Sequence, residues 1–375
     1  MGYAPLPFKQ RHKPTTLHSF DGADGGNSTA GLTLATDGNF YGTTSRGTGA
    51  AADGTVFRIT PNGALTTLHT FCSHSGCSDG SVPEGGVIQA TDGNLYGTTS
   101  SGTVFKITPS GTLTTLGNLV GGSAAALVQG TDGDFYGTTV HGGANTCIGH
   151  GGHRASCGTV FKITPTGTVT TLANLSQETG FNPVSSLIQA TDGNFYGTAE
   201  LGGGTVHPGF GTVFKITPTG TLTVLHRFSG TDGEMPLGAL LQSIDGNFYG
   251  TTFFGGGDPD FSGTVFKITP SGTLTTLHSF GGGDGYGPSA ALIQATDGNF
   301  YGTTAGNGTS LNTIFKITPS GKLTTLHVFS GTDGYTPLST LVEGTNHDLY
   351  GTTEYGVNSA CYGSCGTVFS LSAGL

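Results

Sequence analysis

Side chains that can move protons or hold an anion follow a recurring sequence, Tyr-Gly-Thr-Thr, and they differ from copy to copy. The residues that come next include Arg46, His141, Glu200 (after Thr-Ala), Glu354 and Tyr355. Histidine and glutamate act as general acids and bases, and arginine can neutralise a carboxylate. An enzyme that eliminates across a uronic-acid glycoside needs a cation, a base for the C5 proton and a donor for the leaving oxygen. Exposed loops also collect polar residues that have no chemical role.

Further candidates lie in nearby loops, including two histidines in the 18-residue segment from Val140 to Cys157. We predict these catalytic residues: His141, Arg46, Glu200, His150, His153, His207 and Tyr355. We predict these substrate-binding residues: Ser100, Ser101, Phe253, Phe254, Tyr286, Tyr335 and Glu354. We expect no cofactor and assign no metal ligand. A divalent metal near His150, His153 and His207 is the alternative, but spacing through glycine does not specify a site.

The whole chain repeats one unit of roughly 50 residues. An Asp-Gly-Asn-Phe-Tyr element begins at Asp37 and recurs six times, the last copy weakened at Asn346. A Gly-Thr-Val-Phe-Lys-Ile element and a Thr-Thr-Leu-His-Ser-Phe element follow it. Aromatic and β-branched residues favour strands, and Thr-Asp-Gly-Asn and Thr-Pro-Ser-Gly favour tight turns. Four short strands per unit and no helical period predict an all-β, seven-bladed propeller with four-stranded blades.

The seventh unit is split between the two ends of the chain. Its closing element, Thr15 to Phe20, stands at the N-terminus, whereas its earlier strands end near Leu371. We therefore predict that Thr15 to Phe20 pairs with Gly366 to Leu371 and closes the ring, which removes two exposed strand edges. Residues 1–13 are predicted as an N-terminal extension, and residues 14–375 as a single propeller domain.

Composition limits the partners and the compartment. The formal net charge is −10, and the recurring lysines leave few other cations, so we expect no nucleic-acid partner. No segment is apolar enough for a membrane span, and we expect a monomer. Six cysteines form three local pairs: Cys72/Cys77, Cys147/Cys157 and Cys361/Cys365. We predict three loop disulfides, which indicate a secreted, extracellular or periplasmic protein whose signal peptide is absent from this chain.

The internal alignment separates scaffold from candidate site. His18, His69, His226, His278 and His327 share one strand position, so we interpret them as scaffold. The connections after Tyr-Gly-Thr-Thr vary most, from Ser100-Ser101 to the 18-residue segment, and alternating strands place them on one face. The short hairpin at Ser100-Ser101 lies beside long loops that the predicted disulfides would close. This difference in loop length predicts a notch over blade two. The alternative is that these loops are tolerated insertions.

The Asp-Gly-Asn-Phe-Tyr-Gly-Thr-Thr and Gly-Thr-Val-Phe-Lys-Ile-Thr-Pro elements resemble the GloVer-type tandem repeat found in secreted bacterial proteins. The resemblance covers nearly the whole chain and implies a propeller, but no particular activity. More distantly, Asp-Gly-Asn-Phe/Leu-Tyr is similar to an element of virginiamycin B lyase-type and gluconolactonase-type propellers. Their functional positions have no clear counterpart here, so no catalytic residue is carried over.

Two functional hypotheses remain. The first is a secreted carbohydrate-active propeller, a polysaccharide lyase or glycosidase acting at the variable loops on an extracellular glycan, with uronic-acid-containing glycans as one option. The unequal loops favour it. The second is a non-catalytic module that binds carbohydrate or protein, or serves in surface display. The near-perfect repeats favour that one, because a catalyst usually breaks the symmetry of its scaffold.

Overall fold

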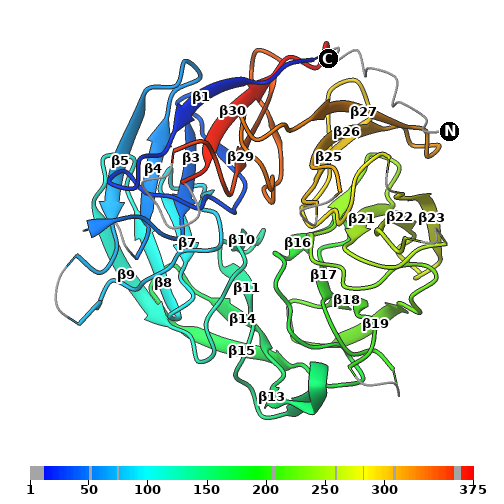
Figure 1. Ribbon diagram of the computed structural model, residues 1–375. Coiled ribbons are helices and arrows are strands. Elements are labelled where there is room, and N and C mark those ends of the chain that lie inside the picture. Colours follow the sequence, from blue (N-terminus) through cyan, green and yellow to red (C-terminus); the bar gives the residue numbers. More distant parts are fainter. Residues whose placement is uncertain are drawn as a thin grey trace, which may run out of the picture.

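A computed structural model describes residues 12–49, 53–73, 76–204, 208–257, 260–281, 283–306, 310–358 and 365–375. They form seven four-stranded antiparallel sheets that stand as blades around a ring, which confirms the predicted fold (Figure 1). Blade one consists of β2 to β5, and blades two to six follow in chain order. Blade seven consists of β28, β29, β30 and β1. Most of the predicted extension, residues 1–13, lies outside the described residues.

Each blade repeats the same four strands. The innermost strands are β2 (Thr33–Leu34), β6 (Ile88–Gln89), β10 (Val128–Gln129), β16 (Ile188–Gln189), β20 (Leu241–Gln242), β24 (Ile293–Gln294) and β28 (Val342–Glu343). The second strands are β3 (Phe40–Thr44), β7 (Leu95–Thr98), β11 (Phe135–Thr139), β17 (Phe195–Ala199), β21 (Phe248–Thr252), β25 (Phe300–Thr304) and β29 (Leu349–Thr353). The third strands are β4 (Thr55–Ile59), β8 (Thr103–Ile107), β14 (Thr159–Ile163), β18 (Thr212–Ile216), β22 (Thr264–Ile268), β26 (Thr313–Ile317) and β30 (Thr367–Leu371). The outermost strands are β5 (Leu65–Thr70), β9 (Leu113–Asn118), β15 (Val169–Asn174), β19 (Leu222–Arg227), β23 (Leu274–Ser279), β27 (Leu323–Val328) and β1 (Thr15–Ser19).

Ring closure follows the prediction. Strand β1 pairs antiparallel with β30, with Thr15 opposite Ser370 and Ser19 opposite Thr367. The two strands lie side by side near the top of Figure 1 although they come from opposite ends of the chain. Phe20 follows β1 and is fully buried. The N-terminal strand therefore supplies both backbone pairing and core side chains to the last blade.

Aromatic rings join neighbouring blades. The tyrosine of the second strand stacks on the phenylalanine that begins the second strand of the next blade, as in Tyr136 and Phe195, whose centroids are 3.9 Å apart. The same contact closes the ring between Tyr350 and Phe40 at 4.3 Å. These rings are almost completely buried. Such a pair contributes about 1 kcal/mol beyond the burial of its area, so repetition around the ring makes this a main source of stability.

The repeated turns hold their charges in fixed networks on one side of the ring, here called the turn face. In blade two, the Asn94 backbone N–H, the Tyr96 hydroxyl and the Lys106 ammonium all donate to the Asp92 carboxylate at 2.9 to 3.0 Å. Blades four, five and six use the same residues. Because aspartate, tyrosine and lysine come from three different elements, this network ties the turn to two strands.

The recurring histidines are also scaffold, as predicted. Each donates or accepts through Nε2 with an aspartate in the following loop, as between His226 and Asp232 at 2.9 Å. The same pairing holds for His18, His69, His278 and His327. A histidine that is fixed by a carboxylate in five blades positions the loop that leads to the next blade.

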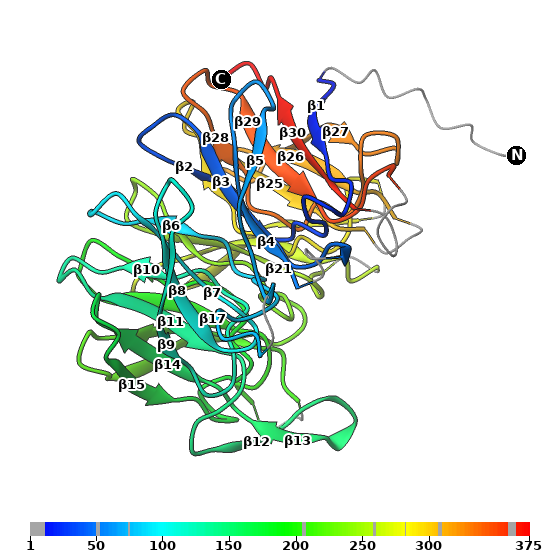
Figure 2. The same cartoon turned by 90° about the vertical axis from the view of Figure 1, so that its left-hand side faces the viewer.

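Blade three carries an additional hairpin made of β12 (Thr146–Ile148), the 3-10 turn η2 (His150–Gly152) and β13 (Arg154–Ser156). It projects beyond the rest of the ring (Figure 2). The Cys147–Cys157 disulfide closes its base, and a second disulfide joins Cys72 and Cys77, so two predicted pairs are confirmed. Cys365 is also disulfide-bonded, and its predicted partner, Cys361, lies outside the described residues. In the part of the chain described, no helix is long and apolar enough to cross a bilayer.

Candidate functional site

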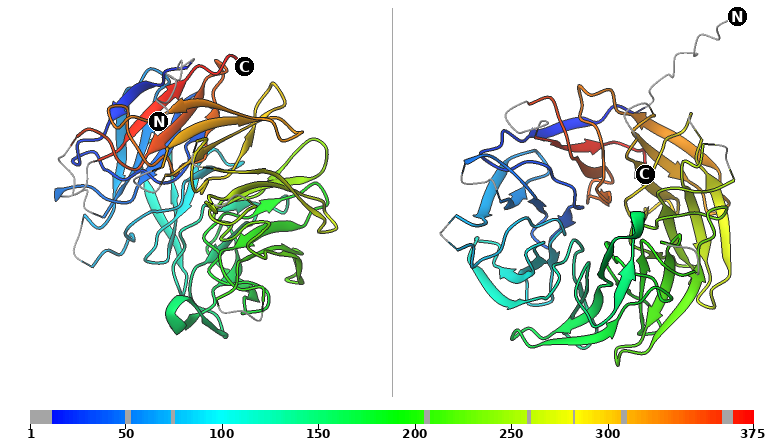
Figure 3. Two further views of the ribbon diagram at one scale, coloured as in Figure 1. Left: turned by 45° about the vertical axis from the view of Figure 1, so that its right-hand side comes forward. Right: turned by 60° about the horizontal axis from the view of Figure 1, so that its bottom comes forward.

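The connections of unequal length all reach the side of the ring opposite the turns, here called the variable face. There, the residues that directly follow each Tyr-Gly-Thr-Thr segment pair with the segment that leads into the same blade. Tyr335 pairs with Tyr355 in this way, and Gly26 pairs with Arg46. These rungs form the rim of the central opening, which the right-hand view of Figure 3 shows between the blades. The predicted site residues that follow Tyr-Gly-Thr-Thr thus stand on the rim.

A cavity of about 420 Å³ opens on this rim between blades seven, one and two; we call it the mouth pocket. The residues that line it are Asn27, Thr29, Ser45, Arg46, Glu84, Tyr335, Glu354 and Tyr355. Arg46 and Tyr355, both predicted as catalytic, therefore share one cavity with Tyr335 and Glu354, both predicted to bind substrate. This places a guanidinium, two carboxylates and two phenols around one space.

Glu354 and Tyr355 influence each other's ionisation. Burial raises the pKa of the Glu354 carboxyl, and a hydrogen bond with Tyr355 and the charge of Arg46 offset part of that rise. Burial and the neighbouring carboxylate raise the pKa of the Tyr355 hydroxyl. The Tyr355 ring stacks on Tyr335, with centroids 5.1 Å apart and planes 24° apart. The pocket thus offers a carboxyl that holds its proton more strongly than usual beside a flat aromatic surface.

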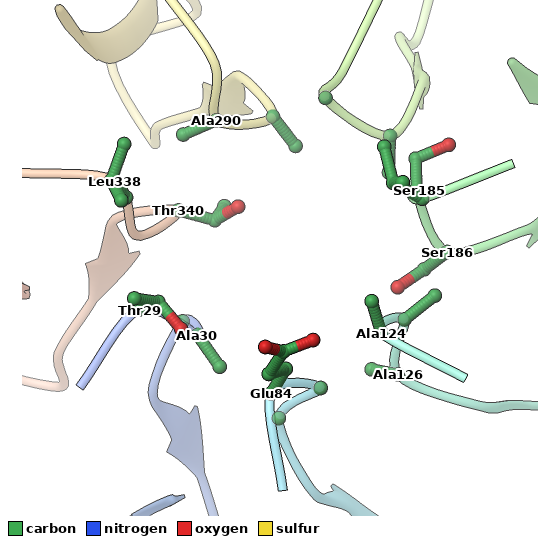
Figure 4. A pocket seen from close by; sticks show the side chains of 18 of the residues that line it. Thr29, Ala30, Glu84, Ala124, Ala126, Ser185, Ser186, Ala290, Leu338 and Thr340 are labelled. Atoms are coloured by element: carbon green, nitrogen blue, oxygen red, sulfur yellow. The ribbon is translucent and has the colours of Figure 1, made fainter. Parts of the chain in front are cut away.

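Glu84 was missed by sequence reasoning. It occupies the position held by Thr29, Ala124, Val184, Leu237, Ser289 and Leu338 in the other blades. These residues surround the neck, a cavity of about 280 Å³ at the centre of the ring, and in Figure 4 the Glu84 side chain points into it. Among the described residues, Glu84 is the one charged residue that lines the neck. The signal was present in the sequence, because Pro83-Glu84-Gly85-Gly86 departs from the apolar or small residues that follow proline elsewhere.

A third cavity, of about 170 Å³, lies over blades two and three, where the sequence predicts a notch. Ser100 and His141 line it together with Glu84, Gly121 and Gly122. Small residues make this part of the rim low. Ser101 turns away from the notch, because its hydroxyl bonds to Thr99 and to the Ser81 backbone. Glu84 borders the notch, the neck and the mouth pocket, so the three cavities meet at its carboxylate.

Other predicted residues lie on another part of the rim, from the hairpin of blade three to the connection that enters blade six. Glu200 accepts a hydrogen bond from the Asn182 side chain, and burial raises the pKa of its carboxyl while His150 lowers it. His150 acts in the same way on Glu234, whose pKa burial also raises. The charge of His150 thus lowers the pKa of both carboxyls, against the larger effect of burial. His153 is exposed on the same hairpin, and His207 lies outside the described residues.

Aromatic residues also gather on this second part of the rim. Phe253 and Phe254 lie edge to face at 4.6 Å, and each is 6.1 Å from the Tyr286 ring. The structure thus brings the predicted residues together as two groups, one with Arg46 and Tyr355 and one with Glu200 and His150. His141 lies at the notch. Among the described residues, no group of three or more histidines, cysteines, aspartates or glutamates is arranged to hold a metal ion.

Two solved structures resemble the ring. The gluconolactonase XC5397 from Xanthomonas campestris aligns over 96% of this chain and 90% of its own length, with 13% identity and a TM-score of 0.48. The extracellular domain of BT4673 from B. thetaiotaomicron, described as a hybrid two-component system, aligns over 96% of this chain, with 14% identity and a TM-score of 0.57. This chain spans 42% of the BT4673 structure, and that likeness concerns the fold alone.

Sequence comparison identifies the repeat itself. No curated protein matches the chain. The family model of the Gloeobacter/Verrucomicrobia repeat matches residues 8–149 and 146–369, which together include nearly every blade. The match agrees with the resemblance carried by the Asp-Gly-Asn-Phe-Tyr and Gly-Thr-Val-Phe elements. The chain therefore belongs to the Gloeobacter/Verrucomicrobia repeat family.

Proposed function

We propose that this protein is a secreted carbohydrate-active propeller that binds an extracellular glycan at the mouth pocket and cleaves it as a glycosidase. The observation that carries the proposal is that Glu354 and Glu84 line one cavity with Arg46 and a stacked tyrosine pair. Two carboxyl groups in different environments are the usual equipment for hydrolysis of a glycosidic bond. The disulfides at Cys72 and Cys147 are in keeping with an oxidising compartment.

In this mechanism Glu354 is the general acid. Burial keeps a proton on its carboxyl to a higher pH than usual, so it can protonate the oxygen of the leaving sugar as the C–O bond breaks. Glu84 is exposed and accepts the proton of the attacking water, whose oxygen forms the new bond to the anomeric carbon. Exchange with solvent then returns both carboxyls to their starting states. Tyr335 and Tyr355 bind sugar faces, and Arg46 binds hydroxyl oxygens.

A lyase is the second candidate, and Arg46 beside Tyr355 favours it. The guanidinium would neutralise a uronate carboxylate, a base would take the C5 proton, and the C4–O bond would break with a proton passing to the leaving oxygen. Tyr355, which lines the same cavity as Arg46, would supply that proton from its phenol. In this reaction the product carries a new C=C bond and no water is consumed.

Five other predicted residues remain candidates for extending the site: His141, His150, His153, His207 and Glu200. His141 lines the notch together with Glu84, and an imidazole can act there as a general acid or base. Phe253, Phe254 and Tyr286 offer a second aromatic surface for a longer glycan. Ser100 lines the notch, whereas Ser101 supports the hairpin.

The decisive experiment is a panel of neutral, acidic and amino polysaccharides, followed by assays for new reducing ends and for absorbance of unsaturated products. Hydrolysis gives reducing ends alone, and elimination gives both signals. Glu354→Gln should lower turnover by about 10²- to 10⁴-fold. Glu178→Gln, the same change on an exposed loop outside the three cavities, should leave turnover unchanged. Binding of glycans without any turnover would instead identify a binding module. Failure to bind any glycan would contradict both enzymatic hypotheses and the carbohydrate assignment.

A further inference from the structure

In the part of the chain that the structure describes, four glutamates on the variable face have no cationic side chain at ion-pair distance. Five of the six turn aspartates that begin an Asp-Gly element lie within 4.0 Å of a lysine ammonium, as Asp245 does with Lys267 at 3.0 Å. By contrast, within the described ranges no ion pair involves Glu84, Glu200, Glu234 or Glu354. Of the residues that the structure describes, Arg46 is the single arginine or lysine that lines the neck, the notch or the mouth pocket. This mouth is therefore acidic.

The glutamates stand on both sides of the opening. Glu354 and Glu200 occupy the same repeat position, each bonded through its backbone N–H to the incoming chain, at Thr336 and Asn182 respectively. They belong to blades seven and four of a ring of seven, so they lie across the opening from each other. Glu84 lies between them, at the neck. A ligand that crosses the opening would meet a carboxylate at each end and one in the middle.

Each side also carries an aromatic surface beside its carboxylates. On blade seven, Tyr335 and Tyr355 are stacked next to Glu354. On blade five, the Glu234 backbone N–H donates to the Phe254 carbonyl at 2.8 Å, so Glu234 adjoins the Phe253, Phe254 and Tyr286 cluster. Aromatic faces bind the apolar face of a pyranose ring and also attract a cation. Sugar rings and positive charges can thus be bound at the same two places.

Half-burial of a carboxylate that forms no ion pair is unfavourable. Burial raises the pKa of Glu200, Glu234 and Glu354, which means that the ionised forms are poorly stabilised in the unliganded protein. A positively charged ligand would stabilise those forms, whereas an acidic ligand would meet like charges. A polyanionic ligand would be attracted by Arg46 but repelled by four glutamates, so binding of a polyanion is disfavoured.

We propose that the glycan crossing this mouth is an amino-sugar polymer whose free amines are protonated, with ammonium groups bound by Glu354, Glu84 and Glu200. The proposal rests on the proposed function and names the substrate class for the same site. Sugar rings would stack on Tyr355 and on the Phe254 cluster, and ammonium groups would bind the carboxylates beside them. The binding should weaken as salt is added, because exposed charge pairs are screened.

The test uses three oligosaccharides of equal length. They are an oligomer of glucosamine with free amines, the same oligomer with every amine acetylated, and an oligomer of galacturonate. Calorimetry in mildly acidic buffer of low ionic strength, where the amines are protonated, compares their affinities. The glucosamine oligomer should bind more tightly than its N-acetylated form by about tenfold or more, the expected size for charge-assisted hydrogen bonds. Glu84→Gln, Glu354→Gln and Glu200→Gln should each weaken it by about tenfold. Glu178→Gln is the matched control and should bind normally.

Equal binding of the acetylated and free-amine oligomers, with loss of both in Tyr355→Ala, would overturn the charge assignment and leave the glycan site standing. Tighter binding of galacturonate would also overturn it and would favour the lyase. If none of the three oligomers binds and the panel of polysaccharides also fails, the proposed function itself is wrong. Circular dichroism of each variant checks that a loss of binding is not a loss of fold.

Discussion

The two faces of the ring treat charge in opposite ways. On the turn face, Asp92 accepts from a backbone N–H, a tyrosine and a lysine, and the same network recurs around the ring. On the variable face, Glu354 has Tyr355 as its neighbour, and burial raises the pKa of its carboxyl; on the turn face burial also opposes ionisation of Asp92, but hydrogen bonds from Lys106 and Asn94 outweigh it and lower the pKa. Repetition therefore marks charges that stabilise the fold, whereas departure from the repeat marks charges that the fold alone does not satisfy.

The contrast extends to hydrogen bonds between blades. A buried threonine on each second strand donates to a backbone carbonyl of the next blade, as Thr251 does to Ala290 at 2.9 Å. At the ring closure, Thr352 makes the same bond to Ser28 at 2.9 Å. The core thus has regular contacts at every junction, and the irregular residues on the rim can change without disturbing them. This separation gives predictions of opposite kind for the two regions.

The largest expected effect concerns the scaffold. Deletion of residues 1–20 removes β1, exposes the edge of β30 and takes Leu17 and Phe20 from the core. Loss of two large core side chains alone costs about 5 kcal/mol, so the melting temperature should fall steeply or the chain should not fold. Differential scanning calorimetry measures it. Deletion of residues 1–11 is the control and should change little. An unchanged melting temperature for the longer deletion would contradict closure by β1.

The second prediction concerns the mouth. Glu354→Gln should lower turnover by about 10²- to 10⁴-fold, the usual range for loss of a general acid. Its melting temperature at neutral pH should stay the same or rise slightly, because the raised pKa means that the ionised carboxylate opposes folding. Steady-state rates and thermal melts measured on the same sample test both parts. A large loss of stability would place Glu354 with the scaffold and remove the contrast between the faces.

The fold was predictable because its determinants are repeated. Seven copies of the turn and strand elements fixed the blade, and the displaced Thr15 to Phe20 element fixed the closure. The histidine series was also correctly interpreted, since a residue used in five blades has five equivalent surroundings. Each of these inferences needed only local chemistry and the internal alignment.

The site was harder to predict because cavities depend on how blades converge. Arg46 and Tyr355 were chosen as residues that follow Tyr-Gly-Thr-Thr, and blades seven and one bring them together. Glu84 enters the same cavity from a different connection, the one that leads into blade two, so attention to a single loop class overlooked it. The sequence shows which residues of the rim are charged. Whether a side chain points toward the centre of the ring depends on how the seven sheets pack.

The third prediction tests the stapled hairpin. Cys147→Ser together with Cys157→Ser should cost about 2 kcal/mol or less, since the disulfide closes a short loop. The hairpin carries His150, which acts on Glu200 and Glu234, so binding of long glycans should weaken while binding of short ones at the mouth pocket is retained. Calorimetry with two oligomer lengths separates the effects. Cys72→Ser with Cys77→Ser is the matched control, and equal losses in both double variants would exclude a specific role for the hairpin.

The smallest expected effect is a pH dependence that has opposite signs on the two faces. The pKa of Asp297 is lowered to about 2; burial alone would raise it, but hydrogen bonds from Lys316, Asn299 and Tyr301 outweigh that effect. A carboxylate with a depressed pKa in the folded state adds stability above its ordinary value of 3.8, and this stability is lost as the pH falls through that value toward 2. Asp297→Asn should therefore lose about 1 kcal/mol at neutral pH, after allowance for solvent screening, and nothing near pH 2.

Glu200, whose pKa burial raises, should behave in the opposite way. As the pH rises through the range in which glutamate ionises, the parent acquires a destabilising carboxylate at position 200. Glu200→Gln cannot ionise there, so its stability relative to the parent should increase. Urea unfolding of both variants across this pH range measures the two slopes, and slopes of the same sign would remove the contrast in charge between the faces.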